Sequence, residues 1–204
     1  MHWIWSLVST LTFQRVRVRM PSRANVAYLT FDDGPHPQNT PALLDLLAAL
    51  QVKATFFLIG DQARAHPDIV MRLVAEGHAI GNHSMTHPNM RKLKPSDQLA
   101  QVDRADAVLA EYDGQPTHMY RPPRGHATVA PILRALTRAQ PLVLWSFDSL
   151  DHKLDAEALQ ARLNRHPPQG GDILLFHDDM SATIAALGNT LPRWQAAGLR
   201  FATL

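Results

Sequence analysis

The hydrophobic and polar positions of the chain follow two alternating patterns. From Val26 onward, short apolar runs that end at Gly, Pro or Asp alternate with longer stretches whose apolar residues recur every three or four positions. Short apolar runs are typical of buried strands, and the longer spacing is typical of helices with one buried face. Strands that alternate with helices usually pair in parallel through right-handed crossovers. The pattern therefore predicts an α/β protein.

Each strand-and-helix unit has its own start and stop signals. Thr40 followed by Pro41 suits a helix N-cap and first helical position, and Asp155 suits another N-cap. About seven units in roughly 180 residues favour a closed, barrel-like sheet over an open doubly wound sheet. We predict strands over residues 26–33, 54–60, 78–81, 118–121, 142–147, 172–176 and 199–203. We predict helices that begin near Thr40, Pro67, Ser96, Val129, Asp155 and Ser181, the last of them broken near Gly188 and Pro192.

The N-terminal region is separate from this pattern. Residues 3–13 are mostly apolar, but the run is shorter than the roughly 20 residues of a membrane span and lacks a basic leader and a small-residue cleavage site. Residues 14–20 alternate basic with apolar side chains, as an edge strand does, or as an interfacial segment does whose arginines contact anionic lipid. We favour an N-terminal arm or edge strand over residues 1–25, with membrane contact as the alternative. Without a clear signal peptide we favour a cytoplasmic location, with a membrane-associated or exported protein as alternatives.

Composition narrows the classes of function. A chain of 204 residues with 46% hydrophobic content is long enough for one sizeable core, so we expect a single domain over residues 26–204. The 20 Lys and Arg residues nearly balance the 18 Asp and Glu residues, which gives a net charge of +2 and does not suggest a nucleic-acid partner. The chain has no Cys. Disulfides and thiolate metal sites are therefore excluded, and any metal must bind to His and carboxylate side chains.

Polar residues that could bind a metal or take part in catalysis lie at the ends of the predicted strands. The first strand ends in Asp32 and Asp33 and is stopped by Gly34 and Pro35. An Asp-Asp-Gly turn is unremarkable by itself, but adjacent carboxylates need separate partners, and a hard cation is the simplest one. The C-terminal ends of parallel strands share one rim of a barrel, where such sites are built. Further polar residues at strand ends are His83, Arg121, Asp148, Asp151 and His177.

Two histidines strengthen the interpretation as a metal site. His83 and His87 are four residues apart, so in a helical turn or tight loop both can reach one ion at about 2.0–2.1 Å. A zincin protease would have Glu directly after the first histidine, whereas this chain has Ser84. The sequence also lacks the Gly-rich nucleotide-binding motifs and the Gly-x-Ser-x-Gly elbow of serine hydrolases. These absences argue against a zincin protease, a nucleotide-dependent enzyme and a serine hydrolase.

These residues resemble the polysaccharide deacetylases, which are also called NodB-homology domains or carbohydrate esterase family four. The resemblance extends over about residues 26–204 and follows the five motifs of that family in order. They are Thr30-Phe31-Asp32-Asp33-Gly34-Pro35, His83-Ser84-Met85-Thr86-His87, Arg121-Pro122-Pro123-Arg124-Gly125, Asp148-Ser149-Leu150-Asp151-His152 and Leu175-Phe176-His177. The resemblance implies a distorted (β/α)7 TIM-like barrel, one divalent metal, usually zinc, and hydrolysis of N-acetyl groups on the N-acetylhexosamine units of a glycan or glycolipid.

The resemblance also implies a role for each site residue. Asp33, His83 and His87 would hold the metal, Asp32 would act as general base, and His177 would act as general acid. The other residues implied would position these groups or contact the substrate. Arg121 would pair with Asp32, Asp151 would orient His177, the backbone N–H of Arg124 would bind the oxyanion, Leu175 would wall the acetyl pocket, and Asp148 and His152 would lie along the substrate.

Two positions depart from the family pattern. Arg124 stands where the family usually has an aromatic residue, and His152 stands where it usually has Trp. An arginine at the rim can pair with a carboxylate or phosphate, so the glycan substrate is expected to be anionic. Two alternatives remain at this point: an O-acetyl esterase that uses the same site, and a carbohydrate-binding relic without catalysis.

Overall fold

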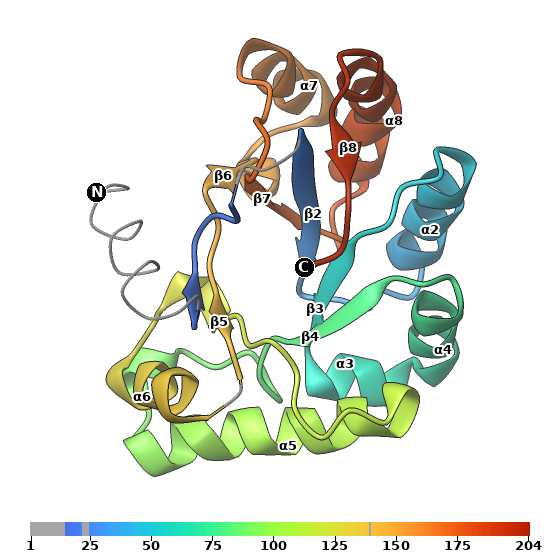
Figure 1. Cartoon of the computed structure of the whole chain (residues 1–204). Helices are drawn as coiled ribbons and strands as arrows, with labels where there is room; N and C mark the ends of the chain where they lie inside the picture. Colours follow the sequence, from blue (N-terminus) through green and yellow to red (C-terminus); the bar gives the residue numbers. More distant parts are fainter. Residues whose placement is uncertain (1–14, 22–24, 139) are drawn as a thin grey trace.

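The α/β prediction is confirmed by the computed structural model, which describes residues 15–21, 25–138 and 140–204 (Figure 1). The predicted segment of residues 3–13 lies outside the described part. The centre of the fold is β2 (Val26–Asp32), which pairs in parallel with β3 (Thr55–Leu58) on one side and with β7 (Ile173–His177) on the other. The same sheet also contains β4 (Ala79–Asn82), β6 (Phe147–Asp148) and β8 (Arg200–Phe201).

The sheet curves round towards closure through short, irregular pairings. β1 (Val16–Arg17) pairs in parallel with β5 (Leu142–Val143) as a separate ribbon. Tyr120 bridges this ribbon to β4, because it pairs with both Asn82 and Leu142. On the other side, Arg19 pairs with Asp172, the residue before β7. The predicted distorted (β/α)7 barrel is therefore confirmed, and its distortion is concentrated in the half that contains β1, β5 and β6.

Two strand predictions need correction in this half. Residues 118–121 form only two isolated bridges, both at Tyr120, rather than a strand, because Pro122 and Pro123 follow and have no N–H to donate. The predicted strand over residues 142–147 is divided into β5 and β6. The shortened pairings leave the rim at Trp145 and Arg124 to loops rather than to strands.

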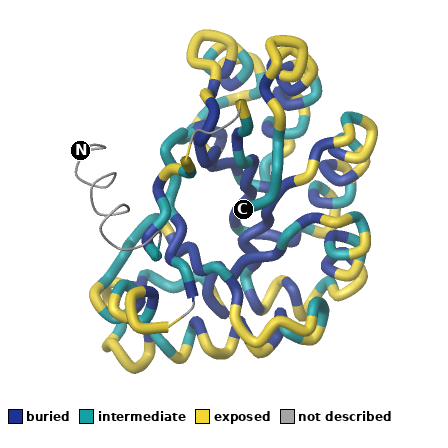
Figure 2. The backbone as a smooth tube through the Cα atoms, in the orientation of Figure 1, coloured by how far each residue is buried: buried dark blue, intermediate teal, exposed yellow. Residues whose placement is uncertain are grey.

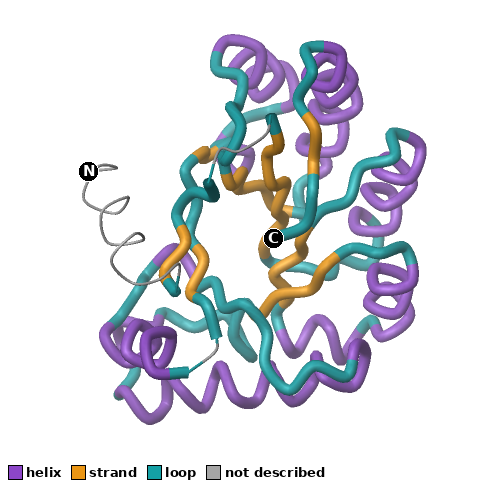
Figure 3. The backbone as a smooth tube through the Cα atoms, viewed as in Figure 1, coloured by secondary structure: helices purple, strands orange, loops and turns teal. Residues whose placement is uncertain are grey.

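Helices cover the outside of the sheet, as Figures 1 and 3 show. They are α2 (Asn39–Ala49), α3 (Gly60–Ala65), α4 (Pro67–Ala75), α5 (Pro95–Asp113), α6 (Val129–Thr137), α7 (Ala156–Arg165) and α8 (Ser181–Ala196). Single 3-10 turns occur at η1 (Met90–Lys92), η2 (Pro123–Gly125) and η3 (Asp151–Lys153). No helix in the described residues is long and apolar enough to cross a membrane.

The predicted break in the last helix is wrong, because α8 continues through Gly188 and Pro192. Proline usually breaks a helix by clashing with the carbonyl four residues earlier and by removing one hydrogen bond. For Pro192, the residue four positions earlier is Gly188. Packing of Leu187, Leu191 and Trp194 in the main core compensates for the lost bond. α3 was also not predicted, because six residues are too few for a clear helical period.

The strands separate two apolar regions. Phe31 packs against Phe56 and Phe176, with ring centroids 5.0 and 6.0 Å apart, in the core beneath the helices. Phe57 belongs to a smaller cluster with Val143 and Ile173. Figure 2 shows the strands buried and the outward turns of the helices exposed. Side chains on both faces of the strands are therefore buried, and this fixes the strand register. The register sets Asp32 opposite His177 at the C-terminal rim.

Candidate active site

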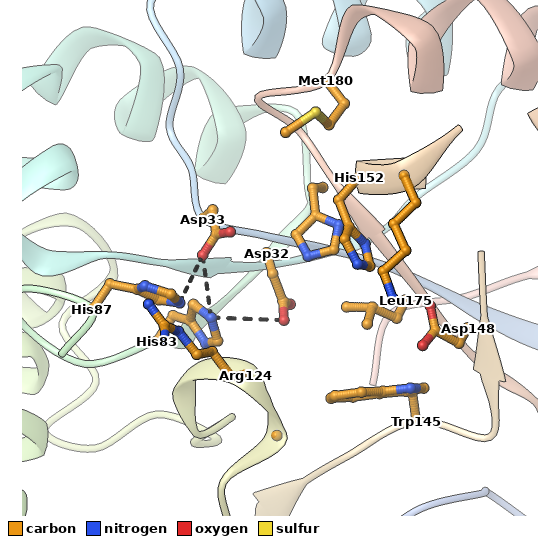
Figure 4. A pocket seen from close by; sticks show the side chains of 13 residues that line it. Asp32, Asp33, His83, His87, Arg124, Trp145, Asp148, His152, Leu175 and Met180 are labelled. Carbon is orange, nitrogen blue, oxygen red and sulfur yellow. Dashed lines mark ion pairs between the residues drawn. The ribbon is translucent and has the colours of Figure 1, made fainter. Parts of the chain in front are cut away.

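A pocket of about 370 Å³ lies at the C-terminal rim, where the predicted residues converge (Figure 4). Most of the predicted site residues line it directly, whereas Arg121 and Asp151 lie behind it and contact Asp32 and His177. The predicted residues in its wall are Asp32, Asp33, His83, His87, Arg124, Asp148, His152, Leu175 and His177. All the predicted site residues are therefore brought to one place.

Asp33, His83 and His87 form a compact set of three possible metal ligands. Oδ1 of Asp33 lies 3.3 Å from Nε2 of His83 and 3.3 Å from Nε2 of His87 (Figure 4). This Oδ1 is buried and has no hydrogen-bond partner among the described residues. Burial opposes ionisation of Asp33, but the imidazoles of His83 and His87 outweigh it and lower the pKa of Asp33 to about 2. An orphaned oxygen between two imidazole nitrogens fits a divalent ion.

Local backbone geometry makes this convergence possible. β2 ends at Asp32, and Asp33 adopts a left-handed conformation with φ 74°. Asp is one of the few non-Gly residues that visit this region readily. Ser84 and His87 are also left-handed, with φ 72° and 51°, so the loop after β4 turns sharply. The loop is therefore tight enough for His83 and His87 to face the same carboxylate.

Buried hydrogen bonds hold the metal-ligand loop. His83 Nδ1 donates to the backbone oxygen of Arg121 at 2.8 Å, which leaves the lone pair of Nε2 facing Asp33. Oδ1 of Asn82 accepts from the N–H of Ser84 at 2.8 Å, and Oγ of Ser84 accepts from the N–H of His87 at 3.1 Å. Asn82 itself donates to Asp106 at 2.8 Å. Asn82 and Asp106 were not predicted to support the site.

Asp32 has a different environment from its neighbour. Nη1 of Arg121 donates to Oδ1 of Asp32 at 2.6 Å and to Oγ1 of Thr30 at 2.7 Å. The guanidinium is fully buried and stacks on the ring of Phe57, 4.0 Å from its centroid. Burial lowers the pKa of Arg121, and Asp32 acts in the opposite direction. Oδ2 of Asp32 lies towards the ligand set, 3.8 Å from Nε2 of His83. One oxygen is therefore anchored and the other faces the pocket.

A second buried pair lies across the pocket. Nδ1 of His177 donates to Oδ1 of Asp151 at 2.7 Å, and the His177 backbone N–H donates to Oδ2 at 2.7 Å. Oγ1 of Thr183 also donates to Oδ2, at 2.7 Å. Burial opposes both charges, but the hydrogen bond between the side chains lowers the pKa of Asp151 and raises that of His177 to about 9. His177 is therefore an imidazolium at neutral pH.

The remaining predicted residues form the walls of the pocket. Leu175, in β7, is 4% exposed. Oδ1 of Asp148 accepts from the N–H of Leu150 at 3.0 Å, so this carboxylate also shapes the turn before η3. Arg124 is exposed and left-handed, with φ 57°. These placements leave the predicted substrate contacts of Asp148, His152, Leu175 and Arg124 as proposals.

The site includes residues that the sequence interpretation missed. Trp145, Lys153 and Met180 line the pocket, although Trp145 was interpreted only as part of a strand. The ring of Trp145 packs so closely on Gly125 that a Cβ there would lie 2.6 Å away. Asp178 is fully buried behind the site and accepts from Thr40, and burial raises its pKa to about 7. Its position directly after His177 was the only signal in the sequence that Asp178 belongs to the site.

Comparisons with known proteins agree with this geometry. A family model described as polysaccharide deacetylase matches residues 19–144. A peptidoglycan-N-acetylglucosamine deacetylase of Bacillus cereus is 35% identical over 190 residues, which cover 90% of this chain and 68% of that protein. A crystal structure of a peptidoglycan N-acetylglucosamine deacetylase superposes with a TM-score of 0.90 at 32% identity, covering 98% of this chain and 95% of that chain.

A further solved structure shows why the site residues matter. A protein of Bacillus anthracis, described as a pseudoenzyme of carbohydrate esterase family four, superposes with a TM-score of 0.84 at 25% identity. The match covers 93% of this chain and 67% of that chain. The same fold therefore occurs with and without activity, so the function of this chain has to be argued from its own side chains.

Proposed function

The chain belongs to the polysaccharide deacetylase family, and from this premise we propose that it is a metal-dependent hydrolase that removes N-acetyl groups from N-acetylhexosamine units of a glycan. The single observation that carries the proposal is the grouping of Asp33, His83 and His87 beside Asp32, with the Asp151–His177 pair on the opposite wall. A carbohydrate-binding relic has no need for a buried base, a buried acid and a ligand set in one pocket.

The Asp-His-His set suits zinc among the divalent metals. Imidazole nitrogens and one carboxylate are ligands that zinc accepts, and three protein ligands leave a position open. A bound ion would acidify a water molecule and polarise the acetyl carbonyl. We propose that Asp33, His83 and His87 bind this ion, because without it the buried Oδ1 of Asp33 has no hydrogen-bond partner among the described residues.

We assign the role of general base to Asp32. Its Oδ2 faces the ligand set, so it can take a proton from the attacking water. The hydrogen bond from Arg121 occupies Oδ1 and leaves Oδ2 facing the pocket for this proton transfer. Because this bond holds the Asp32 side chain, we propose that Asp32 does not bind the metal, whereas Asp33 does.

His177 supplies the proton that the reaction needs at its end. An amide has a poor amine leaving group, so the nitrogen must be protonated as the bond to the acetyl carbon breaks. Asp151 keeps His177 oriented and charged for this step. We propose that the backbone N–H of Arg124 donates a hydrogen bond to the carbonyl oxygen as negative charge develops on it. Leu175 would contact the acetyl methyl group.

The rim suggests an anionic glycan as substrate. Arg124 and Lys153 both line the pocket, and both are exposed. Trp145 contributes an aromatic surface that can stack on a sugar face. The site therefore combines one aromatic surface with two cations, which suits a sugar chain that bears carboxylate or phosphate groups.

The test is acetate release by the purified chain. Peptidoglycan, chitooligosaccharide and acidic exopolysaccharide fragments are offered with zinc, after chelation, and after zinc is restored. We expect release with zinc, loss after chelation and recovery on restoration, with Asp33→Ala inactive throughout. A zinc-loaded protein that releases no acetate from any acetylated glycan would support the relic instead.

A further inference from the structure

A second group of metal-ligating side chains lies on the wall opposite the first. Asp151, His152 and His177 each offer one ligand atom, and these atoms all lie within 4.8 Å of one another. Nδ1 of His177 is 2.7 Å from Oδ1 of Asp151, and Nδ1 of His152 is 3.9 Å from the same oxygen. Two imidazoles and one carboxylate repeat the donor types of the first set.

His152 is the member that the proposed mechanism does not use. Its side chain is 37% exposed, and its ring makes no hydrogen bond within the described residues. The ring meets that of His177 edge to face, with centroids 5.3 Å apart. In Figure 4, His152 lies across Asp32 from Asp33, His83 and His87. The family usually has Trp at this position, and Trp cannot bind a metal, so the usual family pattern lacks this third ligand.

The local backbone explains why these side chains meet. Leu150 is left-handed, with φ 61°, and starts the single turn η3. Within this turn the backbone N–H of His152 donates to Oδ1 of Asp151 at 3.0 Å. Asp151 is in turn fixed by the backbone of His177 and by Thr183. Asp151 and His177 are therefore held in place, and only the exposed ring of His152 has to move for all three atoms to close on one ion.

We propose that Asp151, His152 and His177 form a second zinc site, and that zinc bound there inhibits the enzyme. The ion takes the place of the proton between Nδ1 of His177 and Oδ1 of Asp151, and this proton leaves to the solvent. The remaining N–H of a metallated imidazole is a far weaker acid than an imidazolium. His177 can then no longer protonate the leaving nitrogen.

The inhibitory part of this inference rests on the proposed function, whereas the zinc site does not. Binding is therefore measured first, without activity. Asp33→Ala removes the first site, and zinc content is determined after equilibration with excess zinc and removal of free metal. We expect about one zinc per chain in Asp33→Ala and almost none in Asp33→Ala with His152→Trp. Asp33→Ala with His166→Phe is the matched control, because His166 is an exposed histidine at the C-cap of α7, and it should retain the zinc.

Equal zinc content with and without His152 would overturn the second site. In the chain that keeps Asp33, acetate release is then followed as zinc is added. We expect release to rise and then fall in the unchanged protein, whereas His152→Trp should need about tenfold more zinc for the same fractional inhibition. Each protein is compared with its own maximum, because His152 also lines the pocket. Unchanged sensitivity in His152→Trp would contradict the inhibition, and inactivity of every protein would refute the proposed function without affecting the zinc measurement.

Discussion

The two walls of the pocket differ in how tightly their side chains are held. The metal wall comprises Asp33, His83 and His87. Its histidine loop is fixed by the bond of His83 to the backbone of Arg121, by the bond of the Ser84 N–H to Asn82 and by the bond of the His87 N–H to Ser84. The acid wall comprises Asp151, His152 and His177. Its buried members, Asp151 and His177, are fixed by hydrogen bonds to each other, but the side chain of His152 is exposed and its ring makes no hydrogen bond among the described residues.

This difference separates chemistry from recognition. His83, Asp32 and His177, which are proposed to bind the catalytic ion or to move a proton, have partners that orient them before substrate arrives. The positions that depart from the family pattern, Arg124 and His152, are both exposed at the rim. The comparison therefore predicts that changes to fixed groups abolish the reaction, whereas changes to exposed groups alter which ligands are accepted.

The largest effect is expected from His177→Ala on the acid wall. Loss of a general acid should lower kcat for an N-acetyl substrate by about 10²–10⁴-fold. An O-acetyl ester has a better leaving group, so its hydrolysis should fall much less. Parallel assays on matched amide and ester sugars measure the two ratios. Equal losses on both substrates would remove the assignment of His177 as the acid for nitrogen and would favour an esterase.

The next prediction concerns pH. Because Asp151 raises the pKa of His177 to about 9, activity should fall as the pH rises through that value. Asp151→Asn removes the charge and should move the alkaline limb of the pH profile downwards, towards the ordinary pKa of 6.5. Thr183→Val is the control, because it removes a hydrogen bond but keeps the carboxylate. An alkaline limb that stays in place in Asp151→Asn would refute the pairing.

The same pair has a defined effect on stability. His177 has a raised pKa in the folded state, so its contribution is complete below about pH 6.5 and is lost as the pH rises through about 9. Urea unfolding of the metal-free protein across this range should show the loss in the unchanged chain. In Asp151→Asn this part of the pH dependence should be reduced.

A smaller effect is expected behind the metal wall. Asn82→Ala removes the acceptor for the N–H of Ser84 and the bond to Asp106, so zinc affinity should fall by about 10–100-fold. Competition with a coloured chelator measures this affinity. Gln101→Ala is the matched control, because Gln101 contacts the same loop at the exposed Thr86. Equal affinities in the two variants would mean that the buried network does not orient the ligands.

The smallest effect is expected for Arg124→Tyr. A bidentate pair with a carboxylate would suggest a strong preference, but Arg124 is exposed, and exposed ion pairs contribute about 0.2–1 kcal/mol. The ratio of kcat/KM for acidic over neutral glycans should therefore fall by no more than about fivefold, and less at high salt. Activity should persist because the proposed oxyanion donor is backbone. An unchanged ratio at both salt concentrations would remove Arg124 from substrate choice.

The rim chemistry was predictable because it depends on where strands end. Asp32, His83 and His177 each follow an apolar run, and parallel pairing brings such ends together. The support from Asp106 was not predictable, since it comes from α5, 24 residues away from Asn82. The position of Trp145 was missed because it lies between β5 and β6, within the segment of residues 142–147 that was predicted as one strand. Continuity of α8 depends on tertiary packing that local propensity does not contain.

The central claim is that two adjacent carboxylates have different tasks because Arg121 binds only one of them. The most direct test compares zinc content and acetate release in Asp32→Asn and Asp33→Asn, each made together with His152→Trp so that the proposed second zinc site is absent. We predict that Asp32→Asn retains zinc at the first site and loses activity, whereas Asp33→Asn loses both. A zinc-free Asp32→Asn protein, or an Asp33→Asn protein that still binds zinc through His83 and His87 as tightly as before, would contradict this division.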